Sequence, residues 1–450
     1  MRKKIVWWVG CLGLFCIQPT LAEDLIQVYD LAVQSDPKLR EAEQTLYATR
    51  EAKPQALSLL LPNLSVQGEA TYQNNQITES DVLGGGSYKI NDTYTTTGFT
   101  ASLSQPIYNR KRWISLQQAD HTIAQAEAQY RDSEIELMVR TTEAYFNVLR
   151  LADAVRVQES LKRANARQLE QSKQRFEVGL VAITDVNESQ AAYDRSRANL
   201  ISAKNDLDNA WEALRRIIGP VSVPLARLGD KLPLSPPEPN DMDQWVKSAL
   251  KNNYAIIAAQ EAVASAKQQI EIERSGHYPT LNLSAGYDLT RSDAEFGTDR
   301  DTAFVGLTLN LPIYQGGAVT SRTRQAGYNL SAAQQRLDQV RRQVVEGVKN
   351  AFRGILSSIS DVKARHAAVI SARSALDSTQ AGLEVGTRTQ VDVLNAQRNL
   401  YQAEFDYLSA RYDYIINGIL LHQATSTLTR EILAKGNAWL NPKDLVPPPL

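Results

Sequence analysis

Ten residues, LSVQGEATYQ at positions 64–73, decide which kinds of fold this chain can adopt. Apolar or small side chains alternate in them with polar ones, so an extended strand would have one apolar face and one hydrophilic face. The stretch LNLSAGYDLT at 281–290 repeats the alternation, and each stretch is long enough to cross a bilayer as a tilted strand. Two further segments alternate in the same way. The sequence therefore predicts four strands, over residues 63–74, 95–105, 280–290 and 303–311.

Strands of this kind lie either on a soluble core or in a membrane. Four strands are too few to close a barrel, and an open sheet edge cannot lie in lipid because its backbone groups would stay unpaired. A membrane location therefore requires several chains to combine their strands, and three chains would contribute twelve. The aromatic side chains that we expect at the membrane interfaces are Tyr72, Tyr94, Tyr287 and Phe304.

The sequence also contains an internal repeat. QPIYN at 105–109 returns as LPIYQ at 311–315, and EVG at 177–179 returns at 384–386. Several matches in one order and at nearly one offset favour a tandem duplication over chance, and a proline-rich stretch separates the copies. The predicted organisation is a first repeat at 23–218, a Pro-rich linker at 219–240, a second repeat at 241–430 and a C-terminal tail at 431–450.

Each repeat is predicted to contain two long helices, because no proline interrupts the stretches between Pro106 and Pro220 or between Pro312 and Pro442. The first of these helices is rich in good helix formers and would extend for roughly 100 Å. Such a helix must pack along its length against others, and apolar residues three and four apart predict coiled-coil seams. The predicted helices cover residues 110–178, 185–217, 315–383 and 389–422. The expected fold class is mixed, mostly α with β.

Residues 1–22 have the features of a secretory signal: three basic residues, an apolar run from Ile5 to Ile17 and small residues before the predicted cleavage site. A membrane anchor is the alternative, but the run is shorter than the ~20 residues that a spanning helix needs. Both cysteines, Cys11 and Cys16, lie in this segment. A mature chain without cysteine excludes disulfide scaffolds, thiol catalysis and Cys-ligated metals, while lipid attachment at Cys11 stays open.

No motif in the sequence points to catalysis. The four histidines have no metal-ligand spacing, and the glycines at 84–86 lack the Lys-Ser/Thr pair of a phosphate-binding loop. A net charge of −1 excludes a nucleic-acid binder that works by bulk positive charge. We therefore expect no enzyme, no cofactor, no resident metal and no nucleic-acid partner.

Three motifs resemble the TolC family of outer-membrane exit ducts of Gram-negative bacteria: GLVAITDV at 179–186, LPIYQGG at 311–317, and VGTRT at 385–389 followed by VDVL at 391–394. The resemblance covers almost the whole mature chain. It implies a homotrimer with a twelve-stranded β-barrel in outer-membrane lipid, a twelve-helix periplasmic tunnel and a belt of shorter elements. It also implies a passive duct for efflux or type I secretion, docked to a periplasmic adaptor and to an inner-membrane pump of the RND, ABC or MFS type.

Two glycine turns, at Gly179 and Gly386, separate the long helices and are the predicted hinges. Capping of the following helices explains Thr184, Asp185 and Asp392 when the residues are considered alone. The resemblance assigns more: Gln168, Thr184, Asp185 and Arg388 fall on positions that hold the periplasmic end shut. It also places Asp392 in a constriction ring that binds cations.

The chain departs from the family pattern at two positions. Leu383 stands where the family has a gate tyrosine, and Asn395 replaces a second aspartate of the constriction ring. A trimer would therefore carry three ring carboxylates in place of six. The alternative to a duct is a secreted or periplasmic coiled-coil protein, structural or adhesin-like, without a pore.

Overall fold

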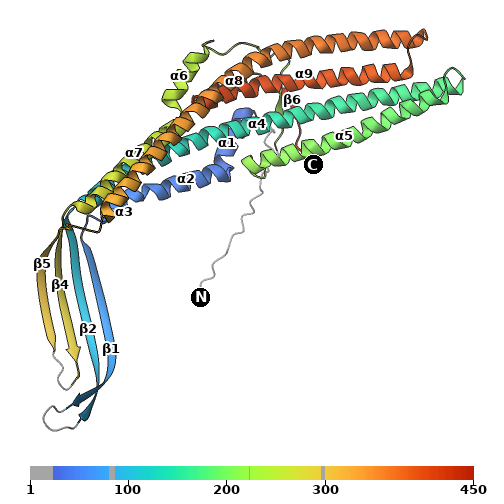
Figure 1. Cartoon of the computed structure of the whole chain (residues 1–450). Helices are drawn as coiled ribbons and strands as arrows, with labels where there is room; N and C mark the ends of the chain where they lie inside the picture. The colour runs from blue at the N-terminus through green and yellow to red at the C-terminus, as the bar shows by residue number, and fades with distance from the viewer. Residues whose placement is uncertain (1–23, 81–86, 222, 295–298, 450) are drawn as a thin grey trace, which may run out of the picture. The chain divides into compact units, whose positions relative to one another are not determined.

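The computed structural model describes residues 24–80, 87–221, 223–294 and 299–449 (Figure 1). The predicted signal segment, Cys11 within it and the glycines at 84–86 lie outside these residues. The described chain forms two compact units. A helical unit contains residues up to Pro37, Ile135–Trp245 and residues from Gly347 onward; a sheet unit contains Lys38–Glu134 and Val246–Glu346. Each unit takes segments from both sequence repeats.

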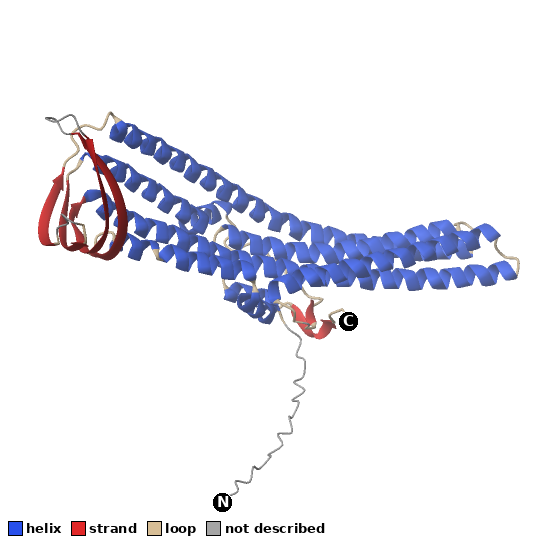
Figure 2. Ribbon diagram, turned by 90° about the horizontal axis from the view of Figure 1, so that it is seen from below, coloured by secondary structure: helices blue, strands red, loops and turns tan. Residues whose placement is uncertain are grey.

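Four antiparallel strands in the order β1-β2-β4-β5 dominate the sheet unit. Their bounds are β1 Asn63–Ser80, β2 Ser87–Asn109, β4 Thr280–Ser292 and β5 Arg300–Asn310. β1 and β5 are the edges of the sheet and have no strand partner within the described chain. The strands gather beyond the helices of this unit and form a curved sheet (Figures 1 and 2).

The strand register separates an apolar face from a polar face. One row across the four strands consists of Leu64, Leu103, Ala285 and Val305. The next row points to the other face and includes Ser65 and Ser102, whose hydroxyl oxygens lie 2.7 Å apart. The alternation seen in single strands is therefore a property of the whole sheet.

Two of the four aromatic residues predicted for the membrane interfaces lie on the polar face, so this prediction is wrong for them. Phe304 pairs with Gly286 in the row of Ser65, and its ring would lie 2.6 Å from a Cβ at that glycine. Tyr94 accepts a hydrogen bond from Asn75 at 3.2 Å on the same face. Gly286, the residue opposite Phe304, has no side chain and so leaves room for the ring on the polar face. The alternation within the strand of Phe304 cannot reveal this space, because Gly286 belongs to the neighbouring strand. Tyr72 and Tyr287 lie on the apolar face.

The first hairpin is longer than the sequence predicts. β1 and β2 pair from Asn63 to Ser80, whereas the predicted strand ended at 74, and β2 contacts β4 only from Thr96 onward. The extra pairs form a two-stranded ribbon. Its residues are mostly polar and carry no apolar alternation, which is why a pattern search ends too early.

Short helices and the first parts of two long helices complete the sheet unit. They are α2 (Pro37–Arg50), α3 (Ala52–Ser58), α6 (Met242–Asn252), α7 (Tyr254–Arg274) and the 3₁₀ turn η1 (Ser275–His277), with the starts of α4 and α8. α4 follows β2 without a loop. Polar contacts join it to its neighbours: Lys53 forms an ion pair with Asp120 at 2.7 Å, and Nδ1 of His121 lies 2.8 Å from the Glu261 carboxylate.

Four long helices lie side by side in the helical unit (Figures 1 and 2). They are α4 (Arg110–Glu177) with α5 (Ile183–Ile218), and α8 (Ala318–Glu384) with α9 (Gln390–Ala424). The core consists of aromatic and aliphatic side chains from several of them. Phe146 of α4 packs on Tyr145 with ring centroids 5.5 Å apart, and on Tyr412 of α9 at 5.9 Å.

The linker and the tail, which the sequence left without structure, form a second small sheet. β3 (Leu225–Leu228) pairs antiparallel with β6 (Leu440–Val446). Tyr145 fixes this sheet to the core by donating a hydrogen bond to the carbonyl of Ala226 at 2.8 Å. Strands this short, so far apart in sequence, have no local signal that a periodicity search can detect.

A buried carboxylate joins the small sheet to two long helices. Asp153 of α4 is 4% exposed and accepts hydrogen bonds from the Tyr412 hydroxyl at 2.6 Å and from Arg227 of β3 at 2.8 Å. Burial raises the pKa of Tyr412 well above its usual value, so the phenol stays a donor. Arg227 also contacts Asp444 of β6 at 3.2 Å. Asp153 and Arg227 together therefore connect the linker, the tail, α4 and α9.

The first and last helices of the described chain also meet. α1 (Leu25–Ser35) contacts α10 (Arg430–Asn437), and Asn437 bonds both to the backbone nitrogen of Leu25 at 3.0 Å and to the Asp24 side chain at 2.7 Å. Arg430 pairs with Asp30 at 2.7 Å. These contacts close the helical unit around residues that are 400 or more positions apart in the sequence.

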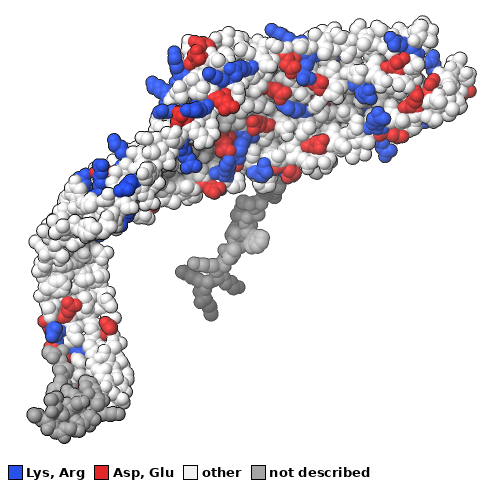
Figure 3. Space-filling view, in the orientation of Figure 1, with Lys and Arg blue, Asp and Glu red and all other residues white. Residues whose placement is uncertain are grey.

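Charged side chains are unevenly distributed. On the face seen in Figure 3 they are spread over the helices, whereas the part of the sheet next to the helices is almost free of them. Among the described helices, none has an apolar stretch of the length needed to cross a bilayer.

Candidate gate at the two helix turns

The two turns between the long helices have the same backbone geometry. Gly179 and Gly386 adopt φ angles of 76° and 79°, in the left-handed region. Leu180 donates its backbone N–H to Arg175 at 2.8 Å, and Thr387 donates to Gly382 at 2.8 Å, five residues back in each case. Both helices thus end in a Schellman motif with glycine at the residue that must be left-handed. The shared geometry explains why EVG occurs in both repeats.

The second turn positions Arg388 tightly. The carbonyl of Gly382 accepts hydrogen bonds from the backbone nitrogens of Thr387 and Arg388 and from the Thr387 hydroxyl. A Cβ at Gly382 would lie 2.6 Å from Cγ of Arg388, so the arginine stem lies directly over this glycine. The guanidinium itself is exposed. In the described part of the chain, neither Arg388 nor Asp185 forms an ion pair within the single protomer.

The helices that follow the turns begin differently. α9 starts with a capping box, in which Thr389 accepts from the Asp392 backbone nitrogen at 3.2 Å and Asp392 accepts from the Thr389 backbone nitrogen at 2.9 Å. The hydrogen bonds from Thr389, with the nearby Arg388 charge, lower the pKa of Asp392. α5 begins at Ile183, and its N-cap residue, Ala182, provides no side-chain hydrogen bond. Capping therefore explains Asp392 but not Thr184 or Asp185.

Leu383 and Asn395, the two departures from the family pattern, face different surroundings. Leu383 packs against an apolar cluster that contains Leu376 and Val393, and so closes the α8–α9 seam. Asn395 lines a groove of about 280 Å³ between α4, α5 and α9. Polar members of its wall are Asn165, Glu188, Arg195, Ser196, Asn199, Asn395 and Arg398.

A chain of hydrogen bonds, partly buried at Gln168 and fully buried at the other residues, crosses three helices just inside the turns. Gln168 of α4 donates to the side-chain oxygen of Gln390 at 2.9 Å, and Gln390 donates to the Ser189 hydroxyl of α5 at 3.1 Å. Ser189 and Ser172 of α4 lie 3.0 Å apart. Gln390, Ser189 and Ser172 are 5%, 0% and 3% exposed. Among these four residues the sequence predicts only Gln168 as part of the site. The sequence feature that indicates a buried polar position in α5 is the seven-residue spacing of Ser189 and Ser196, which places both on the helix seam.

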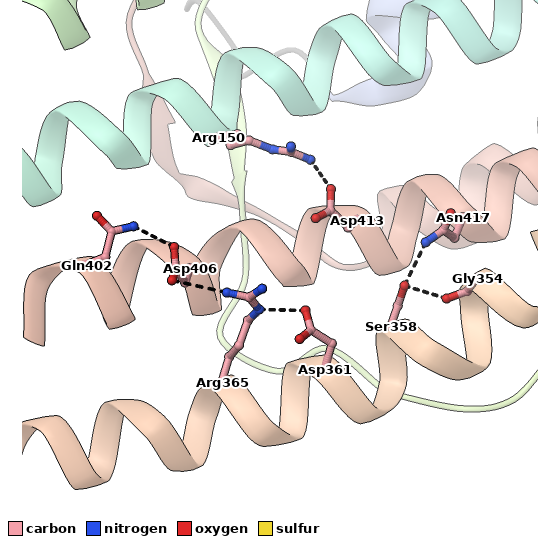
Figure 4. A network of polar contacts seen from close by, with 9 residues as sticks. All are labelled: Arg150, Gly354, Ser358, Asp361, Arg365, Gln402, Asp406, Asp413 and Asn417. Atoms are coloured by element: carbon pink, nitrogen blue, oxygen red, sulfur yellow. Dashed lines mark hydrogen bonds and ion pairs between the residues drawn. The ribbon is translucent and has the colours of Figure 1, made fainter. Parts of the chain in front are cut away.

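Other polar contacts join the helices farther from the turns, and Figure 4 shows them. Arg365 of α8 contacts Asp361 at 2.7 Å and Asp406 of α9 at 3.3 Å. Arg150 of α4 contacts Asp413 of α9. These ion pairs are partly exposed, whereas the Gln390 contacts lie in the interior, so the two sets differ in how strongly water competes with them.

A sequence profile described as "Outer membrane efflux protein" matches residues 28–220 and 245–427. The chain belongs to this family. The two matched segments also confirm the tandem organisation. Family membership confirms the prediction of an outer-membrane efflux duct, and it does not favour a coiled-coil protein without a pore.

Individual relatives agree with the family assignment. The chain is 38% identical to "Outer membrane protein TolC" of Escherichia coli over 94% of its length and 86% of that protein. It is 28% identical to "Alkaline protease secretion protein AprF" of Pseudomonas aeruginosa over 92% of its length and 87% of that protein. The crystal structure of the Campylobacter jejuni CmeC outer membrane channel superimposes with a TM-score of 0.74 at 14% identity, covering 97% of this chain and 98% of that one. The resemblance to the TolC family is confirmed.

Proposed function

We propose that three copies of this chain form a passive exit duct, with twelve strands in the outer membrane and twelve helices around a periplasmic tunnel. The observation that carries the proposal is a four-stranded sheet with one apolar face and two unpaired edges, in a family of outer membrane efflux proteins. Edge β1 of one copy would pair with edge β5 of the next, which removes every open edge from lipid.

The extent of the apolar face suits a membrane. From Leu281 to Leu289 it runs about 27 Å along the strand, at ~3.4 Å per residue, close to the ~25 Å apolar band of such barrels. Asp301 lies directly opposite Leu289 and forms an ion pair at 2.6 Å with Arg291, two residues farther along β4. Charged side chains therefore occur at the end of the apolar face, where the lipid headgroups would begin.

The proposed gate consists of Gln168, Thr184, Asp185 and Arg388, with Gly179 and Gly386 as hinges. Asp185 and Arg388 lie at equivalent turns of the two repeats, and each is free of an ion pair within the described part of its own protomer. A closed ring of three copies would place the second turn of one copy against the first turn of its neighbour. Leu383, which packs inside its own helix pair, would contribute no hydrogen bond across this junction.

The proposed constriction ring contains Asp392 and Asn395 from each copy. Because the pKa of Asp392 is lowered, its carboxylate stays charged in mildly acidic solution, so three negative charges would face the lumen. Divalent cations would bind there and block the pore. Energy for transport would come from an inner-membrane pump coupled through a periplasmic adaptor. Relatives named for efflux and for protease secretion support both kinds of cargo.

Single-channel conductance of the purified protein in planar lipid bilayers tests this function. Arg388→Ser should raise the conductance, Asp185→Ala should act similarly, and the double variant should add little. Each partly exposed pair would be worth about 0–1 kcal/mol, and three pairs in one ring would bias the closed state by up to about a hundred-fold. Arg373→Ser is the control, because Arg373 pairs with Glu404 at 2.8 Å away from the turns. Wild-type protein that forms no channels would refute the duct, and an unchanged Arg388→Ser conductance would refute this gate.

A further inference from the structure

We propose that Phe304 and Asp288 form a contact site for aromatic organic cations in the lumen of the barrel, one site in each copy. The inference rests on the proposed duct function and names a class of cargo for it. Both residues belong to the sheet unit, whereas the residues of the proposed gate belong to the helical unit. The site would therefore act on cargo during its passage through the outer membrane and would have no part in opening the duct.

The first argument is the isolation of Phe304 on the polar face. The rest of its row across the sheet consists of Ser65, Ser102 and Gly286. The two adjacent rows on this face also have only small or polar side chains: Asn63, Ser104, Ser284 and Gly306 in one row, and Gln67, Thr100, Asp288 and Thr302 in the other. In the proposed barrel this face lines a water-filled lumen. Phe304 would therefore be an apolar contact surface within a polar channel.

The second argument is that the ring of Phe304 is only partly covered. A Cβ at Gly286 would lie 2.6 Å from Cε1 and 2.8 Å from Cζ of Phe304, so the ring reaches from β5 across to β4. An aromatic ring that covers a glycine stabilises a sheet, which accounts for the covered part. Phe304 nevertheless stays 44% exposed. In the proposed trimer the adjoining strand would be β1 of the next copy, which has only polar residues on this face from Asn63 to Gln73. The exposed part of the ring would therefore stay open to molecules in the lumen.

The third argument is the carboxylate beside the ring. Asp288 lies on the same face of β4, two residues from Gly286, and is therefore a diagonal neighbour of Phe304 at roughly 7–8 Å between Cα atoms. The Thr100 hydroxyl donates a hydrogen bond to Asp288 at 2.8 Å and so helps to orient the carboxylate. From the row of Asn63 to the row of Glu69, the charged residues on this face are Glu69, Asp288 and Arg300. Two carboxylates against one guanidinium give the face a negative charge in every copy.

An aromatic ring and a carboxylate at this separation suit a molecule that has both an aromatic group and a positive charge. The aromatic group would pack on Phe304, an interaction that contributes more than the burial of apolar area alone. The cationic group would be attracted by Asp288 and by the face of the Phe304 ring. The negative charge of the polar face would also raise the concentration of such cations in the lumen.

The test measures the equilibrium binding of two probes of equal charge to the detergent-solubilised full-length trimer by saturation-transfer NMR. Benzyltrimethylammonium has an aromatic ring, and (cyclohexylmethyl)trimethylammonium has a saturated ring of similar size. The wild-type trimer should bind the aromatic probe more tightly. Phe304→Ala and Phe304→Leu should each weaken binding of the aromatic probe about two- to twelve-fold, the range expected for one aromatic contact. Phe304→Leu keeps an apolar cover over Gly286 and so preserves the sheet. Asp288→Asn should weaken binding of both probes.

Two controls separate the lumen site from general binding to the barrel. Phe304→Tyr keeps the ring and should bind both probes as the wild type does. Phe99→Ala is the matched control, because Phe99 lies opposite Leu289 on the apolar face and is also 44% exposed. It should leave the binding of both probes unchanged. If the wild type binds both probes equally, or if Phe304→Leu still prefers the aromatic probe by the wild-type factor, the site is overturned and Phe304 only covers Gly286. If the wild-type trimer forms no channels in planar lipid bilayers, the proposed function itself has failed.

Discussion

The junction at Asp153 predicts that one hydroxyl controls the attachment of the small β3–β6 sheet. Tyr412→Phe removes the oxygen that donates to the Asp153 carboxylate at 2.6 Å and keeps the ring that packs on Phe146. A hydrogen bond to a charged group contributes about 1.5–3 kcal/mol, and here the carboxylate is 4% exposed, so water cannot easily replace the phenol. Local opening of the sheet should therefore become about 10- to 150-fold more frequent.

Hydrogen exchange of the detergent-solubilised trimer measures this opening, because amides of β3 and β6 exchange through it. Tyr414→Phe is the matched control on the same helix. Tyr414 is also buried, but its single hydroxyl proton points to the backbone carbonyls of Pro233 and Ser235, at 3.2 Å and 3.0 Å, and its oxygen accepts from the Ser235 backbone N–H at 3.1 Å. A neutral bond of this kind contributes about 0.5–1.5 kcal/mol, and it holds residues 233–235 of the linker, which lie outside β3 and β6, so Tyr414→Phe should leave the exchange of the β3 and β6 amides nearly unchanged. Equal loss of protection in the two variants would refute the special role assigned to the carboxylate.

Three further predictions address the membrane face, the pH dependence and the constriction. Val66→Arg on the apolar face should cost about 2–4 kcal/mol near the midplane and Gln67→Arg on the polar face far less, as measured by refolding into lipid vesicles; equal costs would show that the faces are misassigned. His422 is half-buried, and burial together with the charge of Lys435 lowers the pKa of its imidazole in the folded chain. Below the unfolded pKa of about 6.5 the unfolded chain therefore binds the proton more readily, so the folded state loses stability as pH falls below that value. His422→Gln should therefore flatten the decline of thermal stability between pH 7 and pH 5, and an unchanged decline would assign the effect to other groups. Asp392→Asn should weaken block by divalent cations while leaving the conductance without cations nearly unchanged, and block of undiminished strength would place the cation site elsewhere.

Local pattern was sufficient for the strands and the long helices. The alternation that begins at Leu64 and the run of helix formers after Arg110 each depend on residues close in sequence. Each pattern continues for more residues than would be expected by chance, so it indicates a strand or a helix clearly. The small sheet was missed for the opposite reason. Its strands are short and pair across more than 200 residues, from Leu225 to Val446, so only the folded chain brings them together.

The gate was predictable only in part. The glycine turns have a sequence signature because their backbone needs a left-handed residue. The spacing of Ser189 marks a seam position, but its partners do not follow from local pattern, because the burial of Ser189 and Gln390 depends on how α5 and α9 pack against α4. Contacts between copies, such as the one proposed for Arg388 and Asp185, depend on residues that no single chain brings together.

The contact between α1 and α10 has a consequence for biogenesis. A polypeptide delivered to the periplasm N-terminus first presents α1 at the start of export and α10 only near its end. The contacts of Asn437 with Asp24 and Leu25, and of Arg430 with Asp30, can therefore form only after almost the entire chain has been delivered. Contacts across such sequence separation form late in folding. Until then α1 can pack only against elements such as α5, which it also contacts, so the helical unit is complete only when the last residues of the chain arrive.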